Sequence, residues 1–274
     1  MDAVSGERRI VDASSTPATV SSLAAELRAL GLPEDAVVIV HSSLKALGWV
    51  AGGAQAVVQA LLNVVAARGT LVMPTHSGDL SDPGRWQNPP VPESWWEIIR
   101  REAPAFDPSM TPTRAMGAIV ECFRHAPGVR RSAHPTVSFA ASGRRATEIV
   151  DNHELANGLG EGSPLARLYD LDGYVLLIGV GFERCTMLHL AEFRADYAGK
   201  DWITQGSPVL VDGERHWVTY GDLDGDTDDF DRLGSDYVAT GAVTQRPISA
   251  GTMMLMRARP LVDFAVGWFE AQRR

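Results

Sequence analysis

The chain has 274 residues, 45% of them hydrophobic and 22% charged, as in an ordinary folded globular protein. Its net charge of −9 disfavours nucleic acid and anionic membranes as partners, and no apolar run approaches the length of about 18 residues that a membrane-spanning helix needs. The two cysteines form no CxxC pair, which argues against a disulfide framework and favours a reducing compartment, the cytoplasm.

The first part of the chain predicts a helix–strand succession after a short leader. Residues 1–18 have no continuous apolar run, and we expect them to be loosely ordered ahead of one domain over residues 19–274. Apolar periodicity and terminal glycines then predict a helix, a strand, a second helix and a second strand at residues 19–30, 36–44, 52–69 and 69–79. This order is typical of α/β folds.

The middle of the chain is interrupted by a proline- and tryptophan-rich segment, residues 80–113, with one short helix expected near 93–102. Regular elements then resume as a helix, a strand, a helix, a Ser-Pro-capped helix and a buried strand at residues 114–128, 134–143, 144–153, 163–173 and 174–181. Residues 207–256 alternate like antiparallel strands around an Asp-Gly turn, and a last helix is expected at 260–272. The pattern predicts one α/β domain with a loop-rich insertion and an antiparallel C-terminal part.

Polar turns follow three of the predicted strands, and ligands of open α/β sheets bind beyond the carboxyl ends of strands. The first turn contains Ser42, Ser43 and Lys45 and leads to Gly52 and Gly53 at the start of a helix. Free backbone N–H groups at a helix start favour a phosphate group. The segment is neither a P-loop nor a GxGxxG fingerprint, so a plain strand–helix turn remains the alternative.

The third turn contains CTMLHLAEF (185–193), which places a histidine and a glutamate three residues apart. His189 lies near the start of a helix, whose dipole favours a neutral imidazole that can accept a proton, and Glu192 lies on an adjacent face. A buried histidine bonded to backbone would show the same spacing. Cys185, one turn earlier, is either a thiol nucleophile or a small packing residue.

Six aspartates gather in YGDLDGDTDDFDRLG (220–234). The spacing does not fit a calcium loop, because the turn glycine is at the fourth position instead of the sixth and the twelfth residue is Leu233. The segment is therefore a solvated acidic loop or a docking surface for a polyamine. The histidines show no ligand spacing such as HxxxH, and we expect no metal site.

Taken together, the segments VHSSLKALGWVAGG, GTLVMPTHSGD, RRSAHPTVSFAASG, GEGSPLARL, DGYVLLIGVGFERCTMLHLAE and YGDLDGDTDDF resemble, in this order, the aminoglycoside 3-N-acetyltransferase family over about residues 20–258. The resemblance implies the α/β/α architecture of that family. It also implies acetyl transfer from acetyl-coenzyme A to the 3-amino group of a 2-deoxystreptamine aminoglycoside, a cationic substrate. Neither a metal nor an oligomer larger than a homodimer is expected.

The resemblance also assigns site residues. It implies that His189 is the catalytic base, with Glu192 as the first choice for the carboxylate that orients it and Asp222 or Asp224 as alternatives. Asp79, Asp222 and Asp224 would bind the ammonium groups of the substrate. The coenzyme A side would comprise Ser42, Ser43, Leu44, Lys45, Gly52, Gly53, Thr75, Arg131, Ser132 and His134.

Two rival functions keep parts of this assignment. An acyl-coenzyme A-dependent enzyme for another amine, such as a biosynthetic intermediate, would share the coenzyme segments and differ in residues 80–113 and 220–234. A non-catalytic aminoglycoside-binding protein would need no base. For the enzyme, the absence of a GxSxG motif predicts direct transfer without an acyl-enzyme. Backbone N–H groups of the HSS and PTH turns are the candidates for holding the thioester oxygen.

Overall fold

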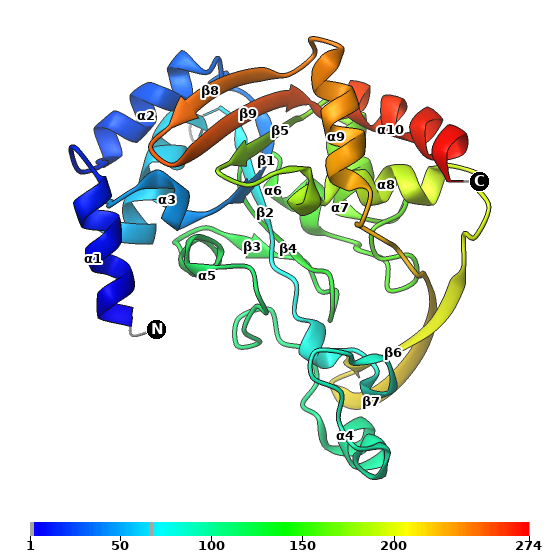
Figure 1. The fold of residues 1–274 in the computed structure, drawn as a ribbon. Coiled ribbons are helices and arrows are strands. Elements are labelled where there is room, and N and C mark those ends of the chain that lie inside the picture. Colours follow the sequence, from blue (N-terminus) through cyan, green and yellow to red (C-terminus); the bar gives the residue numbers. More distant parts are fainter. Residues whose placement is uncertain (1–2, 66–67, 274) are drawn as a thin grey trace.

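The computed structural model describes residues 3–65 and 68–273 and shows one main sheet with helices on both faces (Figure 1). The α-helices are α1 (Ala3–Ala13), α2 (Val20–Ala29), α3 (Gly53–Val65), α4 (Trp96–Glu102), α5 (Ala118–Arg124), α6 (Ala146–Val150), α7 (Pro164–Asp170), α8 (Met187–Arg194), α9 (Phe230–Ala239) and α10 (Ala258–Gln272). The strands are β1 (Val37–Ser42), β2 (Thr70–Pro74), β3 (Arg130–Arg131), β4 (Phe139–Gly143), β5 (Tyr174–Ile178), β6 (Trp202–Val211), β7 (Glu214–Leu223), β8 (Thr244–Ile248) and β9 (Gly251–Arg257).

The main sheet has the strand order β3-β4-β2-β1-β5-β9-β8. β1 pairs in parallel with β2 on one side and β5 on the other, whereas β4 and β9 run antiparallel to β2 and β5. The carboxyl ends of β1, β2 and β5 therefore lie at one edge, and the three polar turns of the sequence all leave the sheet there. This edge is where an open α/β sheet binds its ligands.

The two faces of the sheet carry separate layers of helices. Val38 and Val40 of β1 pack with the cluster that contains α2, α3 and α5, and Ile39 packs with the cluster that contains α6, α7, α8 and α10. The alternation follows from the two-residue period of a strand. The same alternation places His41 on the α8 side and Ser42 on the α2–α3 side.

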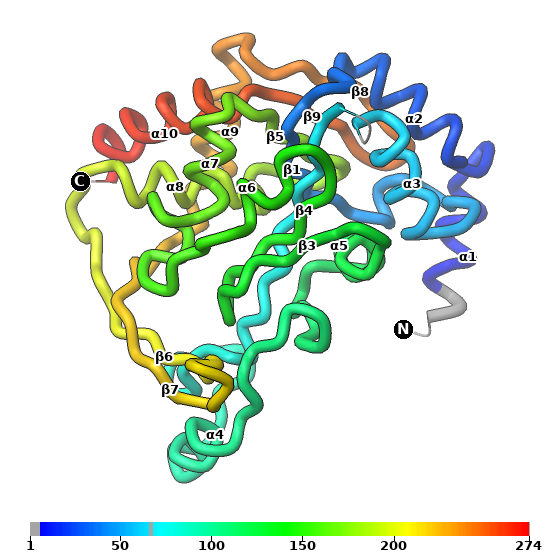
Figure 2. The backbone as a smooth tube through the Cα atoms, turned by 180° about the vertical axis from the view of Figure 1, so that it is seen from behind, coloured from blue at the N-terminus to red at the C-terminus, as the bar shows by residue number. Residues whose placement is uncertain are grey.

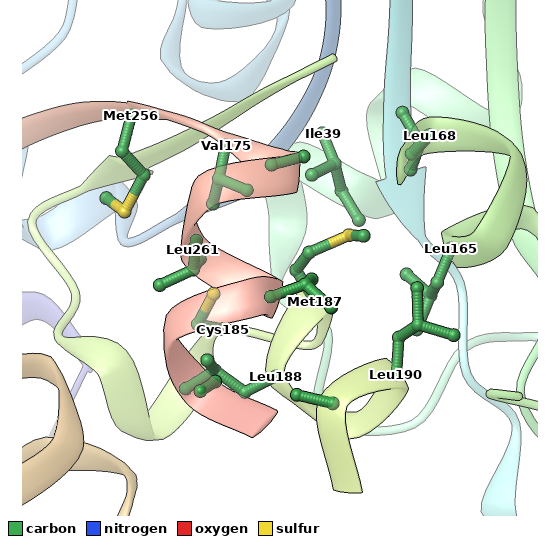
Figure 3. Packing of buried hydrophobic residues seen from close by; sticks show 14 of the residues in the cluster. Ile39, Leu165, Leu168, Val175, Cys185, Met187, Leu188, Leu190, Met256 and Leu261 are labelled. Atoms are coloured by element: carbon green, nitrogen blue, oxygen red, sulfur yellow. The ribbon is translucent and has the colours of Figure 1, made fainter. Parts of the chain in front are cut away.

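Helix α8 lies in the second layer and is buried on nearly every side. Figure 3 shows Met187, Leu188 and Leu190 among Leu261 of α10 and Val175 of β5, and these side chains are fully buried. Truncating one such leucine to alanine would cost about 2–5 kcal/mol. A helix embedded in this way holds its few polar side chains in fixed positions.

The hairpin of β6 and β7 leaves the main sheet and lies beside α4, as both views show (Figures 1 and 2). Its turn is Asp212–Gly213, with φ of 53° and 85°, which is the geometry predicted from the Asp-Gly pair. Arg215 of the hairpin donates to the carbonyl oxygens of Arg100 and Ala103, and the N–H of Phe106 donates to Pro208 O over 3.1 Å. The insertion at 80–113 and the hairpin therefore form one arm.

Two segments differ from the sequence expectation. Instead of a loose leader, residues 3–13 form α1, and Ser14 Oγ accepts a hydrogen bond from the N–H of Trp49 over 2.9 Å; residues 1–2 lie outside the described part. Residues 230–239, expected to be extended, form α9, because Phe230, Leu233 and Tyr237 bury one helical face. The other predicted helices and strands are confirmed within a few residues at their ends, although residues 66–67 of the predicted second helix are not among those described.

Candidate active site

The candidate site is centred on His189, in the first turn of α8. Its Nδ1 lies 2.5 Å from Glu192 Oε2. The carboxylate accepts but cannot donate, so Nδ1 carries the proton and Nε2 keeps its lone pair. The His189 side chain is 19% exposed and that of Glu192 is fully buried. The geometry thus provides a proton acceptor with a fixed tautomer at a partly open position.

The second oxygen of Glu192 is also engaged. Glu192 Oε1 accepts from Arg273 Nη1 over 2.6 Å and from the N–H of Asp226 over 3.1 Å. The backbone of Gly225 lies so close that a Cβ there would be 3.2 Å from Glu192 Oε2 and 3.3 Å from His189 Nδ1. The main chain of the acidic segment therefore covers the dyad of His189 and Glu192. The carboxylate of Glu192 cannot move without disturbing that segment.

Two further histidines approach His189 from the sheet. Burial, together with a smaller effect of the nearby His189, lowers the pKa of His41 to about 3. Burial, with smaller contributions from His189 and His41, likewise lowers the pKa of His76 to about 3. Both imidazoles are therefore neutral at physiological pH. Within the described residues, no group hydrogen-bonds to the buried Nε2 atom of either ring. Sequence reasoning did not assign a role to either histidine.

The three candidate carboxylates have different surroundings. Burial raises the pKa of Asp222 to about 6, against the opposing effects of the Leu223 N–H and of His189. Asp224 pairs with Arg85 over 3.0 Å, and Asp79 pairs with Arg114. Of the three, only Asp222 is largely buried, and no Lys or Arg side chain in the described part of the chain pairs with it.

A pocket of about 450 Å³ lies beside Asp79 and Arg114. Residues 86–89 of the insertion form much of its wall. Arg114 also joins the insertion to the sheet, because its side chain donates to Asn88 O over 3.0 Å and its N–H donates to His76 O over 2.8 Å. The insertion therefore lines a pocket beside the residues that follow His76.

The turn after β1 has the features of a site for a phosphorylated ligand. Ser42 Oγ is buried and has no hydrogen-bond partner among the residues described, and Lys45 is exposed on the short helix that follows. Gly52 and Gly53 have φ of 88° and 56°, conformations that glycine adopts without strain, and α3 begins at Gly53. The N–H of Gly53 itself donates to Val50 O over 3.0 Å, so the N–H groups that α3 could offer to an anion are those of the next two residues.

The remaining residues predicted for the coenzyme side form hydrogen bonds within the protein, and Arg131 among them braces the turn after β2. Arg131 donates to Thr75 O over 2.7 Å and to Ser138 Oγ over 3.0 Å, and burial lowers the pKa of its guanidinium to about 10. Ser132 Oγ bonds to His153 Nδ1 over 2.9 Å. Both ring nitrogens of His134 are occupied, one by Leu155 O and the other by backbone N–H groups. These side chains use their polar atoms inside the protein.

Cys185 is fully buried in the apolar layer, where burial raises the pKa of its thiol to about 12. A thiol in that state is a packing residue and a poor nucleophile. In the described part of the chain, no group of three or more His, Cys, Asp or Glu side chains is placed to hold a metal ion. No described helix is long and apolar enough to cross a membrane.

Comparison with known proteins identifies the architecture that holds this site. The sequence model of the aminoglycoside 3-N-acetyltransferase family matches residues 39–270. The chain belongs to the aminoglycoside 3-N-acetyltransferase family. It is 45% identical to the SPbeta prophage-derived aminoglycoside N(3′)-acetyltransferase-like protein YokD of Bacillus subtilis, over 96% of each chain, and 37% identical to aminoglycoside N(3)-acetyltransferase VII of Streptomyces paromomycinus, also over 96% of each.

Solved structures of family members superpose closely on this fold. The crystal structure of YokD gives a TM-score of 0.94 at 44% identity, covering 97% of this chain and 98% of that one. AAC-VIa bound to sisomicin gives 0.85 at 35% identity, with 94% and 99% covered. AAC-IIIb as a binary complex with CoASH gives 0.83 at 31% identity, with 94% and 98% covered. The expected α/β/α fold of the family is confirmed.

Proposed function

We propose that the protein transfers the acetyl group of acetyl-coenzyme A to the 3-amino group of a 2-deoxystreptamine aminoglycoside. The observation that carries the proposal is the buried Glu192 holding His189 at the ligand-binding edge of this family's sheet. Relatives solved with sisomicin and with CoASH support the two substrates. We also infer a cytoplasmic location, with which the two free cysteines agree.

The base in this proposal is His189. An ammonium group has no free electron pair, so the site must remove a proton before the amine can add to the thioester carbon. His189 Nε2 is the nitrogen left to accept that proton, because Nδ1 is bonded to Glu192. The carboxylate stabilises the imidazolium formed during the transfer. When the tetrahedral intermediate collapses, the departing thiolate takes this proton from His189 and leaves as the free thiol of coenzyme A. The nitrogen of the adduct must lose a second proton to become an amide, and the regenerated neutral Nε2 of His189 can accept it and release it to solvent.

The thioester oxygen gains negative charge and needs hydrogen-bond donors. Among the N–H groups of the HSS and PTH turns, those of Ser43 and Thr75 already donate to Ile178 O and Ser138 O. The neutral imidazoles of His41 and His76 have buried Nε2 atoms on the α8 side of the sheet. We therefore assign the donor role to one or both of these Nε2–H groups.

Carboxylates bind the cationic substrate. Asp222 lies in the buried part of the site, and a charge-assisted hydrogen bond from an ammonium group would contribute about 1.5–3 kcal/mol. Asp79 and Asp224 can contribute where the substrate replaces Arg114 and Arg85 as their partners. On the other side of the site, the Ser42–Lys45 turn and the start of α3 would hold the pantetheine and phosphate parts of coenzyme A, which supplies the activated acetyl group.

A second candidate is acetyl transfer to a smaller amine. The observation in its favour is that Asp79 and Asp224 are each paired with an arginine, which leaves fewer anionic groups for a polycation. Under this candidate the base, the thioester donors and the coenzyme turn keep their roles. The two candidates differ only in the amine that the pocket beside Asp79 accepts.

A thiol-release assay separates these possibilities. The purified protein is incubated with acetyl-coenzyme A and, separately, each aminoglycoside of a panel and several simple polyamines, and the acetylated position is located by NMR. His189→Ala should lower turnover by about a hundredfold or more, in the range of general-base contributions. His216→Ala, on the exposed surface of the hairpin, is the control and should retain activity. Thiol release with polyamines alone would favour the second candidate, and no release with any amine would refute the proposed function.

A further inference from the structure

Arg273 directly follows α10, and its side chain contacts the candidate dyad formed by His189 and Glu192. Its guanidinium makes four hydrogen bonds: Nη1 donates to Glu192 Oε1 over 2.6 Å, Nε and Nη2 donate to the two oxygens of Asp229 over 2.9 and 2.6 Å, and Nη2 donates to Asp226 O over 2.8 Å. The side chain is 12% exposed. No Lys and no other Arg among the described residues forms an ion pair with Glu192.

Aromatic packing fixes the guanidinium in this position. Its central carbon lies 4.1 Å from the ring centre of Phe269 and 5.1 Å from that of Tyr197. Helix α10 packs against α8, so the residue that follows α10 is brought beside Glu192. Because the guanidinium is planar and uses both of its edges, a lysine could replace the charge but not the whole set of bonds.

The bonds of Arg273 leave the carboxylate of Glu192 one free direction, toward His189 Nδ1. They also tie Glu192 to the segment 226–229, whose backbone covers the dyad. We propose that Arg273 is a positioning residue for acetyl transfer: it holds the carboxylate so that His189 presents Nε2 to the substrate amine, and it anchors the acidic segment over the dyad. This inference rests on the proposed acetyl transfer.

The charge of Arg273 also acts on the reaction. The titratable and charged groups around the dyad come from several elements. They are His41 from β1, His76 from the turn after β2, Asp222 from β7, Asp226 and Asp229 from the acidic segment, Tyr197 and Lys200 after α8, and Arg273 after α10. A fixed positive charge opposes protonation of its neighbours. Removing it should let the base take up a proton at higher pH, so the acidic limb of the pH profile of kcat/KM should move to higher pH.

The test compares Arg273→Gln, Arg273→Lys and the control Arg259→Gln. Arg259 lies on the same helix but donates to the carbonyl oxygens of Tyr169 and Asp170, away from the dyad. For each variant, kcat, both KM values and the pH profile are measured with whichever amine the wild type acetylates. We expect Arg273→Gln to lower kcat about ten- to a hundredfold, as for other residues that orient a catalytic group, with the KM for acetyl-coenzyme A unchanged. Arg273→Lys should recover part of the loss, and Arg259→Gln should match the wild type.

The hydrogen-bonded Nδ1 proton of His189 gives a readout that needs no activity. Its NMR signal, assigned by its absence from His189→Ala, should shift in Arg273→Gln and stay in place in Arg259→Gln. A folded Arg273→Gln with wild-type kcat, pH profile and NMR signal would overturn the inference. The inference would also be overturned if Arg273→Gln lowered both kcat and the melting temperature while the pH profile and the NMR signal stayed unchanged. If the wild type acetylates no amine, the proposed function fails, while the NMR result still decides whether Arg273 positions the dyad.

Discussion

Asp222 is predicted to make the unliganded protein less stable at neutral pH than it would be with a neutral side chain at this position. Burial raises the pKa of its carboxyl group from 3.8 to about 6. The folded state therefore disfavours the ionised form that a substrate cation would need. The variant Asp222→Asn keeps the size of the side chain and removes the charge, which separates the cost of the buried charge from packing.

The magnitude follows from the shift. The difference between about 6 and 3.8 is about 2.2 pKa units, and at about 1.4 kcal/mol per unit the upper limit is about 3 kcal/mol. The raised pKa means that the folded state binds the proton more tightly than the unfolded chain. The cost is thus absent below about pH 4, grows between about pH 4 and 6, and is fully present above that range. We expect Asp222→Asn to gain about 1–3 kcal/mol at pH 8.

Urea unfolding of the wild type and the variant at pH 4 and pH 8 tests this prediction. Asp201→Asn, which removes an exposed carboxylate near the start of the same hairpin, controls for the change in net charge. The gain in free energy of unfolding should appear only for Asp222→Asn and only at pH 8, while affinity for the cationic substrate falls. Equal stability of Asp222→Asn and the wild type at pH 8, or an equal gain in Asp201→Asn, would refute the reasoning.

Two further predictions concern the coenzyme turn and the thioester donors. Gln55→Glu places a negative charge in the first turn of α3 and should weaken coenzyme A binding, measured by calorimetry, about tenfold. Gln59→Glu, one turn further along the helix, should have a smaller effect. Equal losses of affinity in the two variants would contradict phosphate binding at the start of α3. His76→Phe should lower kcat about a hundredfold with little change in the KM for acetyl-coenzyme A, and His76→Gln, which keeps an N–H donor, should recover part of it. Wild-type kcat in His76→Phe would exclude His76 as a donor.

Much of the fold could be predicted from local pattern. The parallel strands β1, β2 and β5 are short, buried apolar runs, and in the sequence each run is followed by a polar turn. Ser163 caps α7 through a 3.2 Å bond from the N–H of Leu165, with Pro164 in the first turn, as the Ser-Pro pair predicted. The Asp-Gly pair predicted the hairpin of β6 and β7. These features depend on neighbours in sequence, which is why one sequence was enough to find them.

Features that join distant segments were not predictable in this way. Arg273 and Glu192 are 81 residues apart, and Arg85 and Asp224 are 139 apart. No periodicity links the members of such pairs. Helix α9 was not predicted for a different reason. The aspartates just ahead of it, at positions 222–229, indicate a solvated loop, although Phe230, Leu233 and Tyr237 have helical spacing. That apolar spacing was a signal that could have been used.

The resemblance implied residues for the coenzyme side, and the structure shows that two of these residues have polar atoms engaged inside the protein. Arg131 donates hydrogen bonds to Thr75 Oγ1 and Thr75 O, and these bonds keep the turn after β2 rigid. That rigidity matters because the same turn carries His76. His41 follows Ile39 on the α8 side of β1, whereas His76 lies in the turn two residues beyond Pro74, where β2 ends. One strand and the turn after its parallel neighbour thus bring two imidazoles to the edge where α8 begins, so the reactive centre we propose depends on where these parallel strands end and on the burial of one helix.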